Sequence, residues 1–167
     1  MPSVQKITPF LWFDSEAEEA ATFYTGVFPD SRIIAVSRYG DEGQEVHGRA
    51  PGSVMTVVFE LAGQSFTALN GGPMFKLNES VSFQVTCDTA EEIDHYWDNL
   101  SAGGDPAAQQ CGWLKDRFGL SWQVVPSALP RLLGDPDPAK SRRVMKALLQ
   151  MKKLDLHELE RAHRGES

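Results

Sequence analysis

The alternation of apolar and polar positions is strictest at two places in the chain. Residues 80–87 and 120–125 each place every second side chain on the same face, which is typical of strands. Pro126 ends the second segment because it has no N–H to donate to a ladder. Residues 112–116 form the facing arm and residues 117–119 the turn, so this region predicts a β-hairpin.

Helical spacing follows two capping signals. The first is Asp14 and Ser15, with Glu18 three residues after Ser15; the second is Thr89, with Glu92 three residues later. Both resemble capping boxes, so each predicts that a helix begins there. The apolar stripes of the two helices are Ala17, Ala20, Ala21, Tyr24 and Phe28, and Ile93, Tyr96, Trp97 and Leu100.

The order of elements repeats along the chain. The first half predicts a strand at 6–13, a helix, and strands at 32–39, 53–61 and 64–69. The second half predicts a strand at 80–87, a helix, a short segment at 107–111, and the hairpin. Each half therefore reads as strand, helix, strand, strand, strand, which indicates internal duplication. We expect two modules, about 5–70 and 80–126, within one domain at 1–127.

Residues 128–167 break the repeat and predict helices. A short turn or helix covers 129–133, and Asp137 with Pro138 marks the start of a longer helix that runs to about 152. Asp155 begins a final helix, with Glu158 at the capping-box position. We expect this C-terminal helical tail to pack on the domain, or alternatively on a dimer partner.

Charge and cysteine content narrow the function classes. The net charge is −7, which disfavours nucleic acid as a partner, and no apolar run approaches the ~20 residues of a membrane span. Residues 131–167 carry 9 basic and 6 acidic residues; this basic tail is a solvated surface or a docking surface for a second subunit. Two cysteines, Cys87 and Cys111, and no signal-peptide pattern predict a cytoplasmic protein.

Several motifs carry a family resemblance that spans nearly the whole chain. They are Pro9–Phe13, Phe23-Tyr24, Ala68–Pro73, Ser82-Phe83, Cys87, Trp97, the block from Gly112 to Pro126, and Gly134–Pro138. On these residues the chain resembles the PhnB-like family, a 3-demethylubiquinone methyltransferase-like group of the vicinal oxygen chelate superfamily. The resemblance implies an α+β fold with duplicated βαβββ modules of the glyoxalase/bleomycin-resistance/dioxygenase type. It also implies paired halves that enclose a cavity; the C-terminal helical extension is predicted from the residues of the tail itself.

The resemblance also indicates where metal-using relatives place their ligands. Those places fall near Thr8, Thr67, Ser82 and Gln123. Divalent transition metals favour imidazole, carboxylate or thiolate ligands, and two threonines, a serine and an amide are poor substitutes. We therefore predict no catalytic metal at this site, and no cofactor.

The polar faces of the inner strands suggest a ligand pocket instead. Candidate lining residues are Thr8, Trp12, Thr67, Ser82, Gln84, Ser121 and Gln123, with Asn70, Trp113 and Asp116 at the mouth. The alternative is a filled, hydrogen-bonded interior. Asp116 is a candidate base, although Asp in a turn is commonly structural. His47, in the polar loop 41–52, is the one histidine we retain as a candidate, and Cys111 reads as structural.

These observations predict a small-molecule-binding protein that forms a homodimer, and they do not separate binding from catalysis. A metal-dependent lyase, isomerase or dioxygenase using the same cavity is one alternative. An S-adenosylmethionine-dependent methyltransferase is another, although no strong helix follows the turn Asn70-Gly-Gly-Pro73. Whether the modules pair within one chain or across a swapped dimer stays open.

Overall fold

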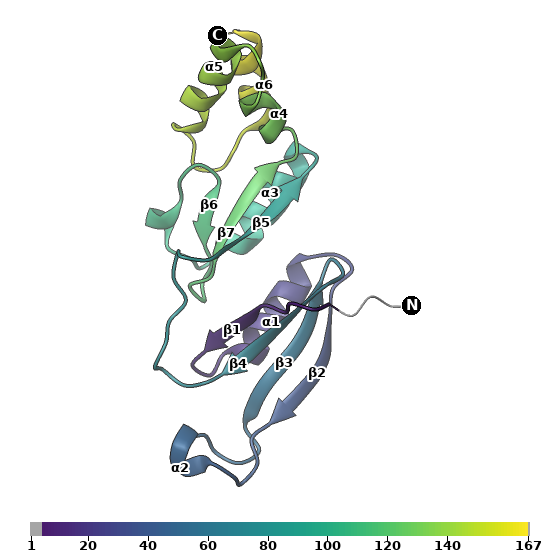
Figure 1. The fold of residues 1–167 in the computed structure, drawn as a ribbon, viewed down its shortest axis with the longest axis vertical. Helices are drawn as coiled ribbons and strands as arrows, with labels where there is room; N and C mark the ends of the chain where they lie inside the picture. The colour runs from purple at the N-terminus through teal and green to yellow at the C-terminus, as the bar shows by residue number, and fades with distance from the viewer. Residues whose placement is uncertain (1–4, 167) are drawn as a thin grey trace. The chain divides into compact units, whose positions relative to one another are not determined.

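The computed structural model describes residues 5–166, which fold as two compact units, the first ending at Leu77 and the second beginning at Asn78 (Figure 1). The prediction drawn from the N-terminal residues falls mainly on residues 1–4, which lie outside the described residues. None of the described helices is long and apolar enough to cross a membrane.

The first unit contains one four-stranded sheet and a covering helix. Its elements are β1 (Phe10–Phe13), α1 (Ala17–Val27), β2 (Arg32–Arg38), α2 (Gln44–His47), β3 (Val54–Leu61) and β4 (Gln64–Asn70). The strand order is β1-β4-β3-β2, with β1 parallel to β4 and the other pairs antiparallel. The predicted order of strands and helix is confirmed, while β1 is shorter than expected and the polar loop contains the short helix α2.

The two faces of this sheet differ in how they are covered. Side chains that alternate toward α1 form the core: Leu11, Phe13, Val57, Phe59, Phe66 and Ala68 are buried together with the apolar stripe of α1. The ring of Tyr24 on α1 stacks on Phe59 with centroids 6.2 Å apart. The opposite face carries the alternate positions, Phe10, Trp12, Thr67 and Leu69 among them, because side chains in a strand point to opposite sides in turn.

The start of α1 differs from the prediction. Ser15 does not cap the helix; the N-cap residue is Glu16, whose side chain makes no capping bond. The N–H of Ala17 donates instead to Oδ1 of Asn70, at 2.8 Å. Asn70 is buried at the end of β4 and also donates from Nδ2 to the carbonyl oxygen of Val54, at 3.2 Å. The cap is therefore supplied by a residue 53 positions away, which local spacing does not reveal.

The second unit begins with a three-stranded sheet. It contains β5 (Ser82–Cys87), α3 (Ala90–Ser101), the 3-10 helix η1 (Pro106–Ala108), β6 (Trp113–Lys115) and β7 (Ser121–Pro126). The strand order is β5-β7-β6. Here the cap is local, as predicted: the Thr89 side chain accepts from the N–H of Glu92 at 3.1 Å. The predicted hairpin is also confirmed.

The second module departs from the predicted strand count. The segment at 107–111 forms no strand; Pro106 opens a 3-10 turn, and Asp105 Oδ1 accepts from the N–H of Ala107 at 2.9 Å. Further along, the backbone N–H groups of Cys111 and Gly112 donate to the carbonyls of residues 151 and 152, both at 2.8 Å. Carbonyl groups of the tail therefore accept from N–H groups that a fourth strand would need for pairing.

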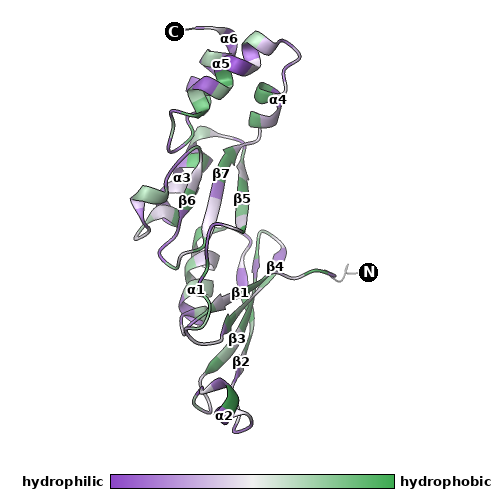
Figure 2. Ribbon diagram, turned by 60° about the vertical axis from the view of Figure 1, so that its left-hand side comes forward, coloured by the Kyte–Doolittle hydropathy of each residue, from purple (hydrophilic) through white to green (hydrophobic). Residues whose placement is uncertain are grey.

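Three helices complete the second unit: α4 (Leu129–Leu133), α5 (Pro138–Leu148) and α6 (Leu156–Arg164). Each of these helices carries both hydrophobic and hydrophilic residues (Figure 2). Their apolar sides meet in a separate small core formed by Leu132, Val144, Leu148, Leu154 and Leu159. The predicted caps are confirmed, because Asp137 accepts from Ala139 N and Asp155 accepts from Glu158 N.

Candidate functional site

Five of the sequence-predicted site residues lie on one face of the second unit's sheet: Ser82, Gln84, Trp113, Ser121 and Gln123. Gln84 pairs with Gln123 in the parallel ladder, and Trp113 pairs with Gln123 from the other side. Ser82 is close enough for its Oγ to accept from Gln123 Nε2 at 2.9 Å. Since the buried face of this sheet carries Val85, Cys87 and Val124, the polar residues occupy the face turned away from that core.

Thr67 and Trp12 occupy the equivalent face in the first unit. Thr67 pairs with Phe10 across the β1–β4 ladder and is only 5% exposed, whereas Trp12 is half-buried. Thr8 lies just before β1 and is half-buried. These residues present hydroxyls and an indole ring from adjacent strands.

Asp116 holds the hairpin turn. It is 2% exposed, and its Oδ1 accepts from the backbone N–H groups of Phe118 at 2.9 Å and Leu120 at 3.0 Å. Its Oδ2 accepts from Nε1 of Trp122 at 2.9 Å. A carboxylate with both oxygens accepting buried donors is placed to fix a turn, and this geometry supports the structural interpretation over that of a general base.

Asn70 has a comparable structural position. As well as capping α1, it accepts at its backbone oxygen from the hydroxyl of Tyr39, at 2.5 Å. Its side chain points to the helix side of the sheet, next to Phe13 in the ladder. Asn70 therefore joins β4 to α1, to the start of β3 and to the loop that follows β2.

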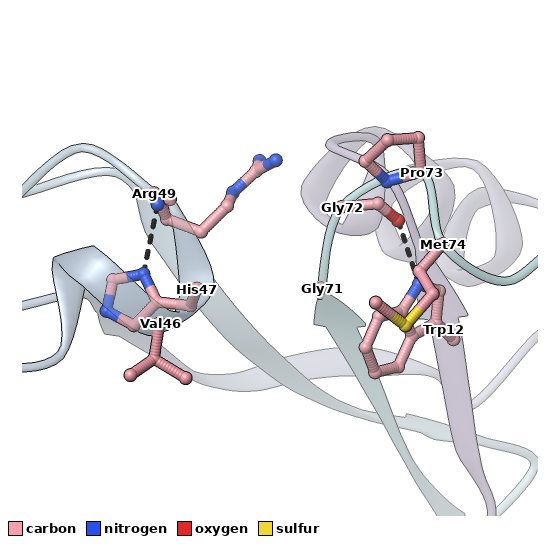
Figure 3. A pocket seen from close by; sticks show the side chains of 9 residues that line it. Trp12, Val46, His47, Arg49, Gly71, Gly72, Pro73 and Met74 are labelled. Carbon is pink, nitrogen blue, oxygen red and sulfur yellow. Dashed lines mark hydrogen bonds between the residues drawn. The ribbon is translucent and has the colours of Figure 1, made fainter.

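A pocket of about 730 Å³ lies in the first unit, between the loop around α2 and the turn after β4 (Figure 3). The residues that line it are Trp12, Val46, His47, Gly48, Arg49, Gly71, Gly72, Pro73 and Met74. Of the ten predicted pocket candidates, only Trp12 lines it, together with His47 from the polar loop. Arg49 and the segment 71–74 were not predicted.

Trp12 forms a fixed wall of this pocket. Its Nε1 donates to the carbonyl oxygen of Gly72 at 2.9 Å, and its ring meets Phe75 edge-on with centroids 5.0 Å apart. Gly71 lies so close to the indole that a Cβ there would overlap the ring. Only glycine at this position lets the backbone approach the tryptophan in this way.

His47 is held by backbone groups on both sides of its ring. Nε2 lies 3.1 Å from the carbonyl oxygen of Glu42, and Nδ1 accepts from the N–H of Arg49 at 3.0 Å. These partners assign the proton to Nε2 of a neutral imidazole. The ring also packs on Tyr39, with centroids 4.5 Å apart. His47 thus fixes the backbone from which Arg49 projects.

Arg49 supplies the positive charge of the pocket. Its side chain is 19% exposed, and its Nη1 lies 3.5 Å from Oδ1 of Asp14, which is 49% exposed. Figure 3 shows the Arg49 side chain extending from the loop toward Gly72 and Pro73, opposite Trp12 and Met74. The pocket therefore combines one cation with an aromatic wall contributed by a strand 37 residues earlier in the chain.

The sequence and the fold are similar to those of known proteins. Residues 5–125 match the model of the family described as 3-demethylubiquinone-9 3-methyltransferase. The chain belongs to this family. A PhnB protein from Bacillus cereus that carries the same methyltransferase description is 37% identical, with a TM-score of 0.62; the match covers 74% of this chain and all of that chain. The PhnB-like assignment made from the motifs is confirmed.

More distant structures establish the fold of this PhnB-like chain. A protein from Pseudomonas aeruginosa is 22% identical, with a TM-score of 0.57, over 74% of this chain and 98% of that chain. The fosfomycin resistance protein FosX from Listeria monocytogenes, complexed with Mn(II) and sulfate, is 13% identical, with a TM-score of 0.52, over 80% and 97%. The chain has the fold of the vicinal oxygen chelate superfamily. No curated protein matches it significantly.

The metal that this superfamily implies does not fit the residues of the PhnB-like chain. The four corresponding positions, Thr8, Thr67, Ser82 and Gln123, offer hydroxyl and amide groups. The Gln123 amide nitrogen already donates to the Ser82 hydroxyl. Within residues 5–166, no group of three or more His, Cys, Asp or Glu side chains is arranged to hold an ion. Transition metals bind weakly to such neutral oxygen donors, so no chemical step is assigned to a metal.

Proposed function

We propose that this PhnB-like protein binds a small organic molecule through the side chains of its first unit, without a resident metal. The observation that carries the proposal is the pocket between Trp12 and Arg49. Its volume of about 730 Å³ falls within the range of ligand sites, roughly 300–1,000 Å³. Such sites combine mainly apolar walls with a few oriented polar groups, as this one does.

The walls of the pocket are held in place before any ligand arrives. Trp12 is fixed by its bond to Gly72, and the backbone of Arg49 is fixed by His47. A binding site of fixed shape loses less conformational entropy when it is occupied. This rigidity favours a pocket used for recognition over an incidental gap between two loops.

The methyltransferase description of the family raises the question of S-adenosylmethionine. Nucleotide-like ligands are commonly held by a glycine turn that leads from a strand into a helix, with backbone N–H groups facing the ligand. Here the Gly71 and Gly72 N–H groups donate to the carbonyls of Phe13 and Asp14, at 2.9 and 3.2 Å. The next element after this turn is the strand β5 rather than a helix. The turn does not fit this mode of binding, and no methyl-transfer step is derived.

Thermal unfolding of the full-length protein against a broad set of small organic compounds tests the proposal. A compound present at 100 times its dissociation constant stabilises the folded protein by about 2.7 kcal/mol, which raises the melting temperature by several degrees. We expect hits whose effect disappears in Trp12→Ala. A broad set without a single hit would overturn the proposal.

Two further measurements separate the alternatives. Elemental analysis of protein purified without chelator is expected to find no stoichiometric transition metal, and a stoichiometric metal would favour a metal-dependent enzyme. Calorimetry with S-adenosylmethionine is expected to give no binding heat. Saturable heat would favour the methyltransferase function instead.

A further inference from the structure

We infer that the Trp12–Arg49 pocket selects flat aromatic acids with a single negative charge. The acid group would bind the Arg49 guanidinium, and the aromatic body would lie against Trp12 and the apolar rim. This inference rests on the proposed function and specifies its ligand class.

The state of Arg49 is the first support. The Arg49 side chain is only 19% exposed, yet its ion pair with Asp14 joins one atom of each side chain at 3.5 Å. That distance is long for a charge-assisted hydrogen bond, and arginine binds carboxylates best through two parallel N–H bonds. An incoming acid can form the paired arrangement that Asp14 does not form here. Asp14, being half exposed, can turn to water at little cost.

The apolar rim is the second support. Val46 is 86% exposed and Met74 is 77% exposed, and both line the pocket. Phe75, which packs on Trp12, is 58% exposed. Large apolar side chains gathered around one hollow mark binding surfaces when they are otherwise open to water. A flat hydrocarbon body placed against Trp12 would cover them.

The charges around the pocket limit the ligand to one negative charge. The loop that carries Arg49 also carries Asp41, Glu42 and Glu45, all exposed, and Asp14 faces the guanidinium. His47 is neutral in this arrangement, with both ring nitrogens hydrogen-bonded to the backbone. One arginine among four carboxylates cannot balance a dianion such as a phosphate monoester. A carboxylate or sulfonate matches it better.

Two fluorescent probes with the same aromatic skeleton provide the test. Anilinonaphthalene sulfonate carries one negative charge, and N-phenyl-1-naphthylamine carries none. Both are titrated into the full-length protein, its Arg49→Gln variant and a control variant, Arg32→Gln. Arg32 is 73% exposed and pairs with Glu60, so this control removes the same charge from β2 without touching the pocket lining.

We expect Arg49→Gln to raise the dissociation constant of the sulfonate probe by about tenfold or more, because the variant loses one charge-assisted contact. The dissociation constant of the neutral probe should change by less than about twofold in Arg49→Gln. Arg32→Gln should leave the dissociation constants of both probes unchanged. Val46→Ser, at an exposed position that folding does not depend on, should weaken both probes. Together these results would support the inference.

The opposite results are equally clear. If both probes bind Arg49→Gln as they bind the natural protein, the anion selectivity is overturned while small-molecule binding survives. If only compounds unlike these acids stabilise the protein in the thermal screen, the ligand class is overturned and the proposed function stands. Equal weakening by Arg32→Gln would show a general charge effect and would also overturn the inference.

Discussion

Replacing Asp116 by Asn should destabilise the second unit by far more than its small change in size suggests. In the natural protein one carboxylate oxygen accepts two backbone N–H groups and the other accepts the indole N–H of Trp122. Asn can keep the two backbone bonds through its oxygen, but its NH₂ group then faces the indole donor. Two buried donors would oppose each other where a charge-assisted bond had been.

The magnitude follows from the burial of these groups. Asp116 is 2% exposed and Trp122 is 3% exposed, so water cannot replace the lost acceptor. A hydrogen bond to a charged group contributes about 1.5–3 kcal/mol, and a buried donor left unsatisfied costs about 1–3 kcal/mol. Because these two figures partly overlap, we expect Asp116→Asn to lower the free energy of unfolding by about 2–4 kcal/mol.

Urea unfolding followed by circular dichroism and tryptophan fluorescence measures this loss. A double-mutant cycle isolates its cause: Trp122→Phe removes the indole donor, so Asp116→Asn should cost at least about 1 kcal/mol less in that background. Asp98→Asn, the same change at an exposed position of α3, should stay within about 0.5 kcal/mol of the natural protein. If Asp116→Asn also stays within that range, the role given to the carboxylate is refuted.

Three other changes have defined outcomes. Gly71→Ala should abolish probe binding in the pocket by pushing the Trp12 ring aside, and retained affinity in fluorescence titration would contradict the close packing. Burial, helped by nearby acidic charges, raises the pKa of the Cys87 thiol from its ordinary value of 9.0 to about 12. The folded state therefore keeps this proton longer, and stability should fall between pH 9 and 12 by up to about 1.4 kcal/mol per pH unit. In Cys87→Ala, the free energy of unfolding measured by urea titration should fall less steeply between pH 9 and 12. An equal fall in the variant and the natural protein would contradict this role of Cys87. Hydrogen bonds from the Asp137 N–H and, second in size, from His163 lower the pKa of Asp135 below its ordinary value of 3.8. These bonds therefore stabilise the folded protein above pH 3.8, and the stabilisation is lost in stronger acid. Asp135→Asn should reduce the dependence of the free energy of unfolding on pH in acid, and an unchanged dependence would contradict this role.

Local signals in the sequence predicted local structure well. The caps at Thr89, Asp137 and Asp155 each join residues two or three positions apart, and the hairpin depends on a short turn. Spacing within a few residues determines such contacts. The helix predicted after Ser15 is present, but the predicted cap at Ser15 is wrong, because the Ala17 N–H donates to Asn70 from another strand, which local spacing does not reveal.

Non-local contacts account for what the sequence did not reveal. The pocket joins Trp12 to Arg49 and to the turn after Asn70, and no local spacing relates these positions. Its two prior signals were Trp12, predicted on the polar face of the first strand, and a histidine in a glycine-rich polar loop; His47 holds the backbone of Arg49. The missing fourth strand of the second module has a similar origin, because the tail takes up the N–H groups of Cys111 and Gly112.

The dependence of α1 on Asn70 has a consequence for the order of folding. We expect the Thr89 cap to form once α3 is synthesised, whereas the cap of α1 requires a residue 53 positions further on, which must first pair in β4. Synthetic peptides covering 14–28 and 88–102 should therefore differ in helix content, with the second more helical, and equal content would contradict this order. Both modules place a helix after their first strand, yet the first helix is capped by a long-range contact and the second by a local one.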